Sequence, residues 1–161
     1  MKLAEHPRIG SLTVKKVLSQ IPIEPWSVDA GTLAIEALRI ISESNVGALL
    51  VVGGNPAVGL FSERIFLSQS VLGKYKSEQA SVVSLMTPCN ISVTQYQTAE
   101  ECLAAMRETK IHFLPVLEDG EAVGLLSLDA LLQAIVTHQE RVFAALELDL
   151  RILFLQGTYS C

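Results

Sequence analysis

Residues 58–67, VGLFSERIFL, decide how this chain folds, because residues 123–132, VGLLSLDALL, repeat them 65 positions later. Without a gap, residues 27–67 and 92–132 share 14 identities in 41 positions. Average residue usage would give roughly two or three. The chain therefore contains two copies of one supersecondary unit, and we expect each copy to bury its apolar face against the other.

Each copy has the pattern of a strand, a helix, two strands and a second helix. Apolar residues at helical spacing predict a helix at 32–43, capped by Asp29 or Thr32, and Thr98 is the expected cap in the second copy. Paired apolar runs around a polar turn predict one hairpin in each copy. The expected strands are 26–28, 48–52, 57–61 and 91–93, with a second hairpin around Glu118–Gly120.

Short lead-in helices and serine caps complete the pattern. SLTVKKVLSQ (11–20) predicts an amphipathic turn before the first copy, and SVVSLMTP (81–88) predicts one before the second. Ser62 and Ser127 precede the last helix of each copy and are expected to cap it. The polar segment 73–80 reads as an exposed linker.

Residues 146–155, LELDLRILFL, extend beyond both copies. Their alternation of apolar and charged residues predicts a half-buried strand, although a helix also fits. Either structure leaves an apolar face that needs cover. We therefore expect a homodimer that buries this segment.

The composition excludes several classes of protein. The 161 residues are 50% hydrophobic, which is enough for a core, and the net charge of −5 argues against nucleic acid as a partner. Three cysteines without metal-ligand spacing favour a reducing compartment. No stretch resembles a signal peptide or a membrane span. We expect a cytoplasmic protein without a membrane partner, although a soluble fragment of a membrane protein would have the same features.

Several motifs resemble those of the tandem cystathionine-β-synthase-type (CBS) domain pair, or Bateman module. They span about residues 13–140 and are NVGALLVV, GLFSER, LMTPCNISV, TAEECLAAM and HFLPVLEDGEAVGLLS. The resemblance implies an α/β (α+β) fold in which two β-α-β-β-α units pack about a pseudo-twofold axis. The expected segments are a lead-in (1–12), a first unit (13–72), a linker (73–80), a second unit (81–141) and an apolar extension (142–161).

The resemblance also implies a function. The family is typically regulatory and non-enzymatic, and binds AMP, ADP, ATP, NADH or S-adenosylmethionine between the units, often as dimers. Its ligand signature is Gly-h-h-Thr/Ser-x-x-Asp, where h is apolar. The signature's Asp position holds Ile65 in the first copy and Ala130 in the second, and Asp129 lies one residue early, a rotation of about 100°. Each loss removes a hydrogen bond of about 1.5–3 kcal/mol to the ribose.

The remaining signature residues favour phosphate. A serine hydroxyl at a helix N-terminus attracts anions, Arg64 could clamp a phosphate, and the rings of His112 and Phe113 could stack on a purine. The two serines are also good caps without any ligand. The candidate ligand-binding residues are Gly47, Ala48, Ser62, Arg64, His112, Phe113, Ser127 and Asp129.

Two functions are compatible with these residues. The first is a module that senses an adenosine-containing nucleotide and signals to a regulated protein that the sequence does not name. The alternative is a degenerate, ligand-free module that acts as a dimerisation or interaction scaffold. No catalytic residues, metal ligands or required cofactor are expected, because His6, His112 and His138 lack metal-ligand spacing and no catalytic set can be assembled.

Overall fold

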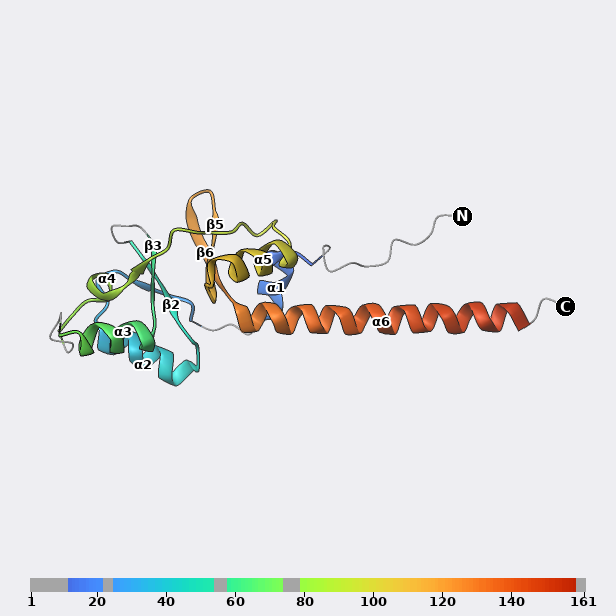
Figure 1. Ribbon diagram of the computed structural model, residues 1–161, viewed down its shortest axis with the longest axis horizontal. Coiled ribbons are helices and arrows are strands. Elements are labelled where there is room, and N and C mark those ends of the chain that lie inside the picture. The colour runs from blue at the N-terminus through green and yellow to red at the C-terminus, as the bar shows by residue number, and fades with distance from the viewer. Residues whose placement is uncertain (1–11, 22–24, 54–57, 74–78, 159–161) are drawn as a thin grey trace.

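The computed structural model describes residues 12–21, 25–53, 58–73 and 79–158. These residues form two lobes, and a long helix extends from the second lobe (Figure 1). The first lobe contains most of the first copy of the repeat and the second lobe contains most of the second copy. This is the mixed α/β fold of two tandem units that the sequence predicts.

The first lobe is built on a four-stranded sheet of order β1-β2-β3-β4. Its strands are β1 (Ser27–Asp29), β2 (Leu49–Val52), β3 (Val58–Phe61) and β4 (Thr87–Pro88). β1 runs parallel to β2, and the other neighbours are antiparallel. Helices α2 (Ala34–Ser44) and α3 (Glu63–Val71) lie beside this sheet. Leu49, Leu50 and Val51 of β2 are all fully buried. A strand buried on both faces needs a continuous run of apolar residues, which is what its sequence shows.

The second lobe contains the hairpin of β5 (Phe113–Glu118) and β6 (Glu121–Ser127), together with α5 (Ala99–Thr109). The expected strand at 91–93 is reduced to a single parallel bridge between Val93 and Val116. In the first lobe, the amide of Leu50 donates to the Trp26 carbonyl at 2.8 Å. The position equivalent to Leu50 is Pro115, which has no N–H to donate. The parallel ladder therefore cannot extend here.

The two lead-in helices are exchanged between the lobes. Helix α1 (Val14–Gln20) precedes the first unit but packs on the second lobe, and α4 (Val82–Leu85) precedes the second unit but packs on the first (Figure 1). The backbone hydrogen bonds that the two lead-in helices form with the opposite units correspond to each other. The Val14 amide donates to the Gln97 carbonyl at 2.9 Å, and the Val82 amide donates to the Thr32 carbonyl at 2.8 Å. This reciprocal exchange is what a twofold relation between the units produces.

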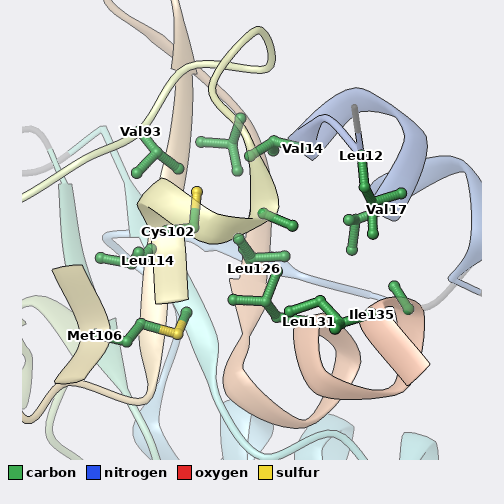
Figure 2. Close-up of a cluster of buried hydrophobic side chains, with 13 residues drawn as sticks. Leu12, Val14, Val17, Val93, Cys102, Met106, Leu114, Leu126, Leu131 and Ile135 are labelled. Atoms are coloured by element: carbon green, nitrogen blue, oxygen red, sulfur yellow. The ribbon is translucent and has the colours of Figure 1, made fainter. Parts of the chain in front are cut away.

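Each lobe has its own hydrophobic core, and each core includes the exchanged lead-in. Figure 2 shows Leu12, Val14 and Val17 facing the core of the second lobe. Val82 and Leu85 take the same place in the core of the first lobe. Each lead-in helix therefore belongs to the core of the other unit. The unit boundaries expected from the sequence stay a prediction.

The helix caps confirm most of the sequence predictions. The Ser62 Oγ accepts from the Ile65 amide at 3.2 Å, and Thr98 forms a complete capping box with Glu101. The prediction of Asp29 or Thr32 as the cap of α2 is wrong, because Leu33 occupies the N-cap position and provides no side-chain hydrogen bond. The Thr32 carbonyl accepts from the Val82 amide of α4, and the helix begins two residues later, at Ala34.

The tail is a helix, and the prediction of a half-buried strand at 146–155 is wrong. Helix α6 (Leu128–Thr158) is continuous over 31 residues. No proline interrupts it, and an i,i+4 ion pair between Glu147 and Arg151 at 3.1 Å supports its C-terminal half. Among the described helices, none combines the length and apolar character required to cross a membrane.

Candidate functional site

The first group of candidate residues lies where β3 meets α3. The Ser62 Oγ caps α3, and its hydroxyl hydrogen remains available to donate to an anion. Arg64 lies in the first turn of the helix and is exposed. Within the described chain, no ion pair is recorded for its guanidinium. Gly47 and Ala48 precede β2, which pairs with β3, so they lie at the same end of the sheet.

The second group lies at the equivalent place in the other lobe. The Ser127 Oγ accepts from the Ala130 amide at 3.1 Å, and Phe113 is opposite Ser127 in the hairpin. His112 is exposed, and its carbonyl accepts from the Leu128 amide at 2.8 Å. Asp129 is exposed in the first turn of α6. The hairpin and the helix start thus place these four candidate residues together.

The two groups differ in charge. Arg64 and Asp129 are 65 residues apart and occupy the same position in the first turn of their helices. A helix N-terminus attracts anions through its free N–H groups and its dipole. Arg64 strengthens that attraction in the first lobe, whereas the Asp129 carboxylate opposes it in the second. Only the first group therefore combines a capping serine, a helix N-terminus and an adjacent cation.

A contact between Gly47 and Phe113 joins the two groups across the lobes. A Cβ added to Gly47 would lie 2.9 Å from the Phe113 Cζ, so a larger residue at position 47 would require the ring to move. Phe113 itself is half-buried. The ring that the sequence assigns to purine stacking therefore lies against the backbone of the opposite unit.

The signature's two missing aspartates are replaced by apolar side chains in the first turn of each helix. Ile65 and Ala130 are half-buried, and their amides donate to the capping serines. Neither side chain can accept a hydrogen bond from a ribose hydroxyl. In the described part of the chain, no group of three His, Cys, Asp or Glu side chains could hold a metal ion.

Two contacts could not be found by reading the sequence. The Gly47–Phe113 contact joins residues 66 positions apart in different units, and the lead-in exchange places Leu18 against Gly124. The spacing of the lead-ins does not reveal the exchange, because Val14 and Val82 are 68 positions apart rather than 65. That offset separates the lead-ins from the gapless repeat.

Comparisons with known proteins identify the class. A family model described as "CBS domain" matches residues 9–71 and 82–137. The chain therefore belongs to the CBS domain family, and the two matched segments make it a tandem CBS module. The resemblance seen in the sequence is confirmed.

The relatives and solved structures agree with this assignment. The mitochondrial CBS domain-containing protein CBSX3 of Arabidopsis thaliana is 30% identical over 129 residues, which are 77% of this chain and 60% of that protein. CBSCBSPB2 of the same organism is 26% identical, and the match covers 86% of this chain and 26% of that protein. The chain thus spans 60% of the first of these curated relatives and about a quarter of the second.

Among solved structures, a CBS domain crystal structure is 30% identical with a TM-score of 0.68, and the match covers 78% of this chain and 98% of that one. The crystal structure of CBSX2 in complex with AMP is 26% identical with a TM-score of 0.65, and the match covers 80% and 98% of the two chains. The AMP in that complex is bound to CBSX2.

Proposed function

We propose that this tandem CBS module is non-enzymatic and regulatory, and that it senses an adenosine-containing nucleotide between its two units. The proposal is supported by the family and by the AMP complex of CBSX2. AMP, ADP, ATP, NADH and S-adenosylmethionine are the ligands to test.

One observation carries the proposal, which is the arrangement of Ser62 and Arg64 at the N-terminus of α3. A phosphate at this position would meet the free amides of the first helical turn, the Ser62 hydroxyl and the Arg64 guanidinium. Ile65 contributes no ribose acceptor, so the phosphate contacts supply a larger share of the affinity than in a site with the complete signature. We therefore expect ATP and ADP to bind more tightly than adenosine.

The exchanged lead-in helices suggest how binding is transmitted. α1 belongs to the core of the second lobe but continues along the chain into β1 of the first lobe. A ligand that contacts both units and prefers one relative orientation shifts the population toward it, by no more than its differential affinity for the two orientations. The lead-ins cross between the units, so they would move with that change and present it to a partner.

The direct test is thermal unfolding and calorimetric titration with the five ligands. A ligand at 100 times its Kd adds about 2.7 kcal/mol to the stability, which raises the Tm of a chain of this size by roughly 5–11 °C. Arg64→Ala should weaken ATP binding by about tenfold or more, because a charge-assisted hydrogen bond is lost. Arg107→Ala, at an exposed arginine on α5, is the matched control and should leave the affinity unchanged. Equal affinity in both variants would exclude Arg64 from the site.

The alternative is a ligand-free scaffold, and the contact between Phe113 and Gly47 favours it. If the ring fills the space that a purine needs, Phe113→Ala should create or strengthen nucleotide binding. If the ring stacks on the base, the same variant should weaken binding by roughly 1–3 kcal/mol, or about five- to a hundredfold. Absence of any Tm shift for the wild type and for Phe113→Ala would support the scaffold.

We also propose that the module acts as a homodimer in the cytoplasm. The free thiols of Cys89 and Cys102 support a reducing compartment. The dimer is supported by the apolar residues that α6 exposes. Sedimentation of the full chain at tens of micromolar tests the dimer, and a monomer would contradict it.

A further inference from the structure

Helix α6 presents an apolar stripe that no element of the described fold covers. α1, α5 and β6 contact α6, and Figure 1 shows α1 and α5 beside its N-terminal turns while its C-terminal half extends away from both lobes. Leu131, Ala134 and Ile135 bury one face in the core of the second lobe. The exposed apolar stripe lies beside that buried face and continues past the end of the lobe.

The residues of the stripe follow coiled-coil spacing. Steps of four and three residues alternate along the helix when Gln139 is counted between Val136 and Phe143, and this spacing keeps the apolar side chains within about 100° of one another. Five of the six are exposed by between 42% and 71%, and Leu146 is half-buried. The stripe consists of Leu132, Val136, Phe143, Leu146, Leu150 and Leu153.

We propose that a second copy of this chain covers the stripe, so that two α6 helices form a parallel coiled coil. The inference rests on the homodimer proposed above and assigns its surface and geometry. Leucine recurs at the d positions (132, 146 and 153), and valine, phenylalanine and leucine occupy the a positions (136, 143 and 150). Gln139 falls at the remaining d position and is the one polar residue of the seam between Leu132 and Leu153.

The size of the stripe fits a dimer. It spans 22 residues from Leu132 to Leu153, about 32 Å between the first and last Cα atoms. Buried against a second copy, the stripe and the stems of its polar flanks would cover on the order of 500 Å² per protomer. The total is then about the 1,000 Å² that a specific interface requires.

Charge favours the parallel orientation. An antiparallel pair with the stripes in full overlap would bring Glu140 near the partner's Glu147, and both are exposed carboxylates. In the parallel pair, Glu147 instead lies beside the partner's Val142, so these two carboxylates do not meet across the flank. Either orientation would give a closed twofold assembly, so the flanking charges decide between them.

Two leucines provide a matched test of the surface. Leu150 lies in the stripe and is 66% exposed, whereas Leu148 is 58% exposed and points to the opposite face, about 200° around the helix. Sedimentation equilibrium of the full chain should show a dimer for the wild type and for Leu148→Glu, with Leu150→Glu dissociating at least a hundredfold more readily. Circular dichroism checks that all three chains remain folded.

The possible results separate the surface from the dimer itself. If the wild type and both variants are dimers of equal affinity, the homodimer stands and the α6 surface is wrong. A monomeric wild type overturns both, and leaves the stripe to a different protein or to a lipid surface. If both glutamate variants dissociate equally, the effect is not specific to the stripe and the proposed surface is wrong.

Orientation is tested by disulfide trapping in a Cys161→Ser chain. Leu150→Cys should form an intermolecular disulfide in the parallel pair, because equivalent core positions come within bonding distance. In the antiparallel pair, the two copies of position 150 would be separated by about 22 Å. Phe143→Cys, near the middle of the stripe, should cross-link in either orientation and is the positive control. Cross-linking at 143 without cross-linking at 150 would overturn the parallel arrangement.

Discussion

Gly59 lies directly against Met86, and a Cβ on Gly59 would come within 2.7 Å of the Met86 Cγ. Sixty-five residues later, a Cβ on Gly124 would lie 3.1 Å from the Leu18 Cδ1. Met86 directly follows the exchanged helix α4, and Leu18 belongs to the exchanged helix α1. The two glycines therefore occupy equivalent environments, as the pseudo-twofold repeat predicts.

This relationship predicts unequal effects of two alanine substitutions. Gly59→Ala should destabilise the protein by about 2 kcal/mol, because the Cγ and Cβ of Met86 are close to the backbone and cannot easily move. Gly124→Ala should cost less than about 1 kcal/mol, because only a terminal methyl of Leu18 has to move. Urea denaturation measures both changes in the free energy of unfolding.

The control is Gly31→Ala, where nothing lies within 4 Å of the added Cβ. It should be neutral or slightly stabilising, because it restricts only the unfolded chain. In a chain that already carries Met86→Ala, Gly59→Ala should cost less stability than it costs in the wild type. Equal costs at positions 31 and 59 would contradict the close contact.

The helix caps predict a stabilising substitution at Leu33. Leu33 and Thr98 are equivalent N-caps with similar backbone angles, and Glu36 is equivalent to Glu101 of the Thr98 capping box. Leu33→Thr should complete a second capping box and stabilise the protein by about 0.5–1 kcal/mol. Leu33 is 39% exposed, so only part of its side chain is buried, and the loss of that packing opposes the gain from the cap. The midpoint of urea denaturation measures the gain.

Two further variants control for this effect. Thr98→Ala should destabilise the protein by about 1 kcal/mol through loss of the cap. Adding Glu36→Gln to Leu33→Thr should keep most of the gain, since glutamine also completes the box. A lower denaturation midpoint for Leu33→Thr would show that packing of the leucine outweighs the missing cap.

Local chemistry explains which parts of the fold the sequence predicts. The hairpins, the helices and the caps at Ser62, Thr98 and Ser127 depend on residues close together in the chain, and all of them are found. The secondary structure of the tail could not be decided from the sequence, because apolar residues two positions apart suit a strand and also a helix that is apolar on several faces. The strand expected at 91–93 is reduced because Pro115, in the strand beside it, has no N–H. The sequence shows this proline but does not show that segment 91–93 pairs with it.

The residues of the candidate site come from the sequence and stay a prediction, whereas their arrangement could not be predicted. Ser62 and Arg64 follow from the repeat and from the position of the helix start. The contact of Phe113 with Gly47 depends on how the two units pack, and no local pattern encodes that packing. The exchange of the lead-in helices is likewise a long-range relationship between segments of low similarity.

The exchange predicts where core substitutions are felt. Val17 precedes the first unit in sequence but is fully buried in the core of the second lobe. Val17→Ala should destabilise that core by about 1.5–3 kcal/mol, since two methyl groups are removed and a cavity is left. Native-state hydrogen exchange should show the larger loss of protection in α5 and the β5–β6 hairpin.

Val82→Ala is the matched substitution, because Val82 is fully buried in the core of the first lobe. It should reduce protection mainly in α2, β2 and β3. If Val17→Ala instead affected α2 most strongly, the exchanged packing would be contradicted.

Burial raises the pKa of the Cys102 thiol to about 11, and the neighbouring Glu101 carboxylate adds to the shift. The unfolded thiol ionises near its ordinary value of 9.0, so between about pH 9 and 11 the unfolded state releases a proton that the folded state keeps. Stability from this group is therefore fully present below pH 9 and is lost as the pH rises toward 11. The free energy of unfolding of the wild type should fall relative to that of Cys102→Ala across this range, and chemical denaturation at pH 7, 9 and 10.5 measures the difference. Other titrating groups cancel in the comparison, because both chains carry them. A constant difference at the three pH values would show that the Cys102 thiol ionises equally in the folded and unfolded states.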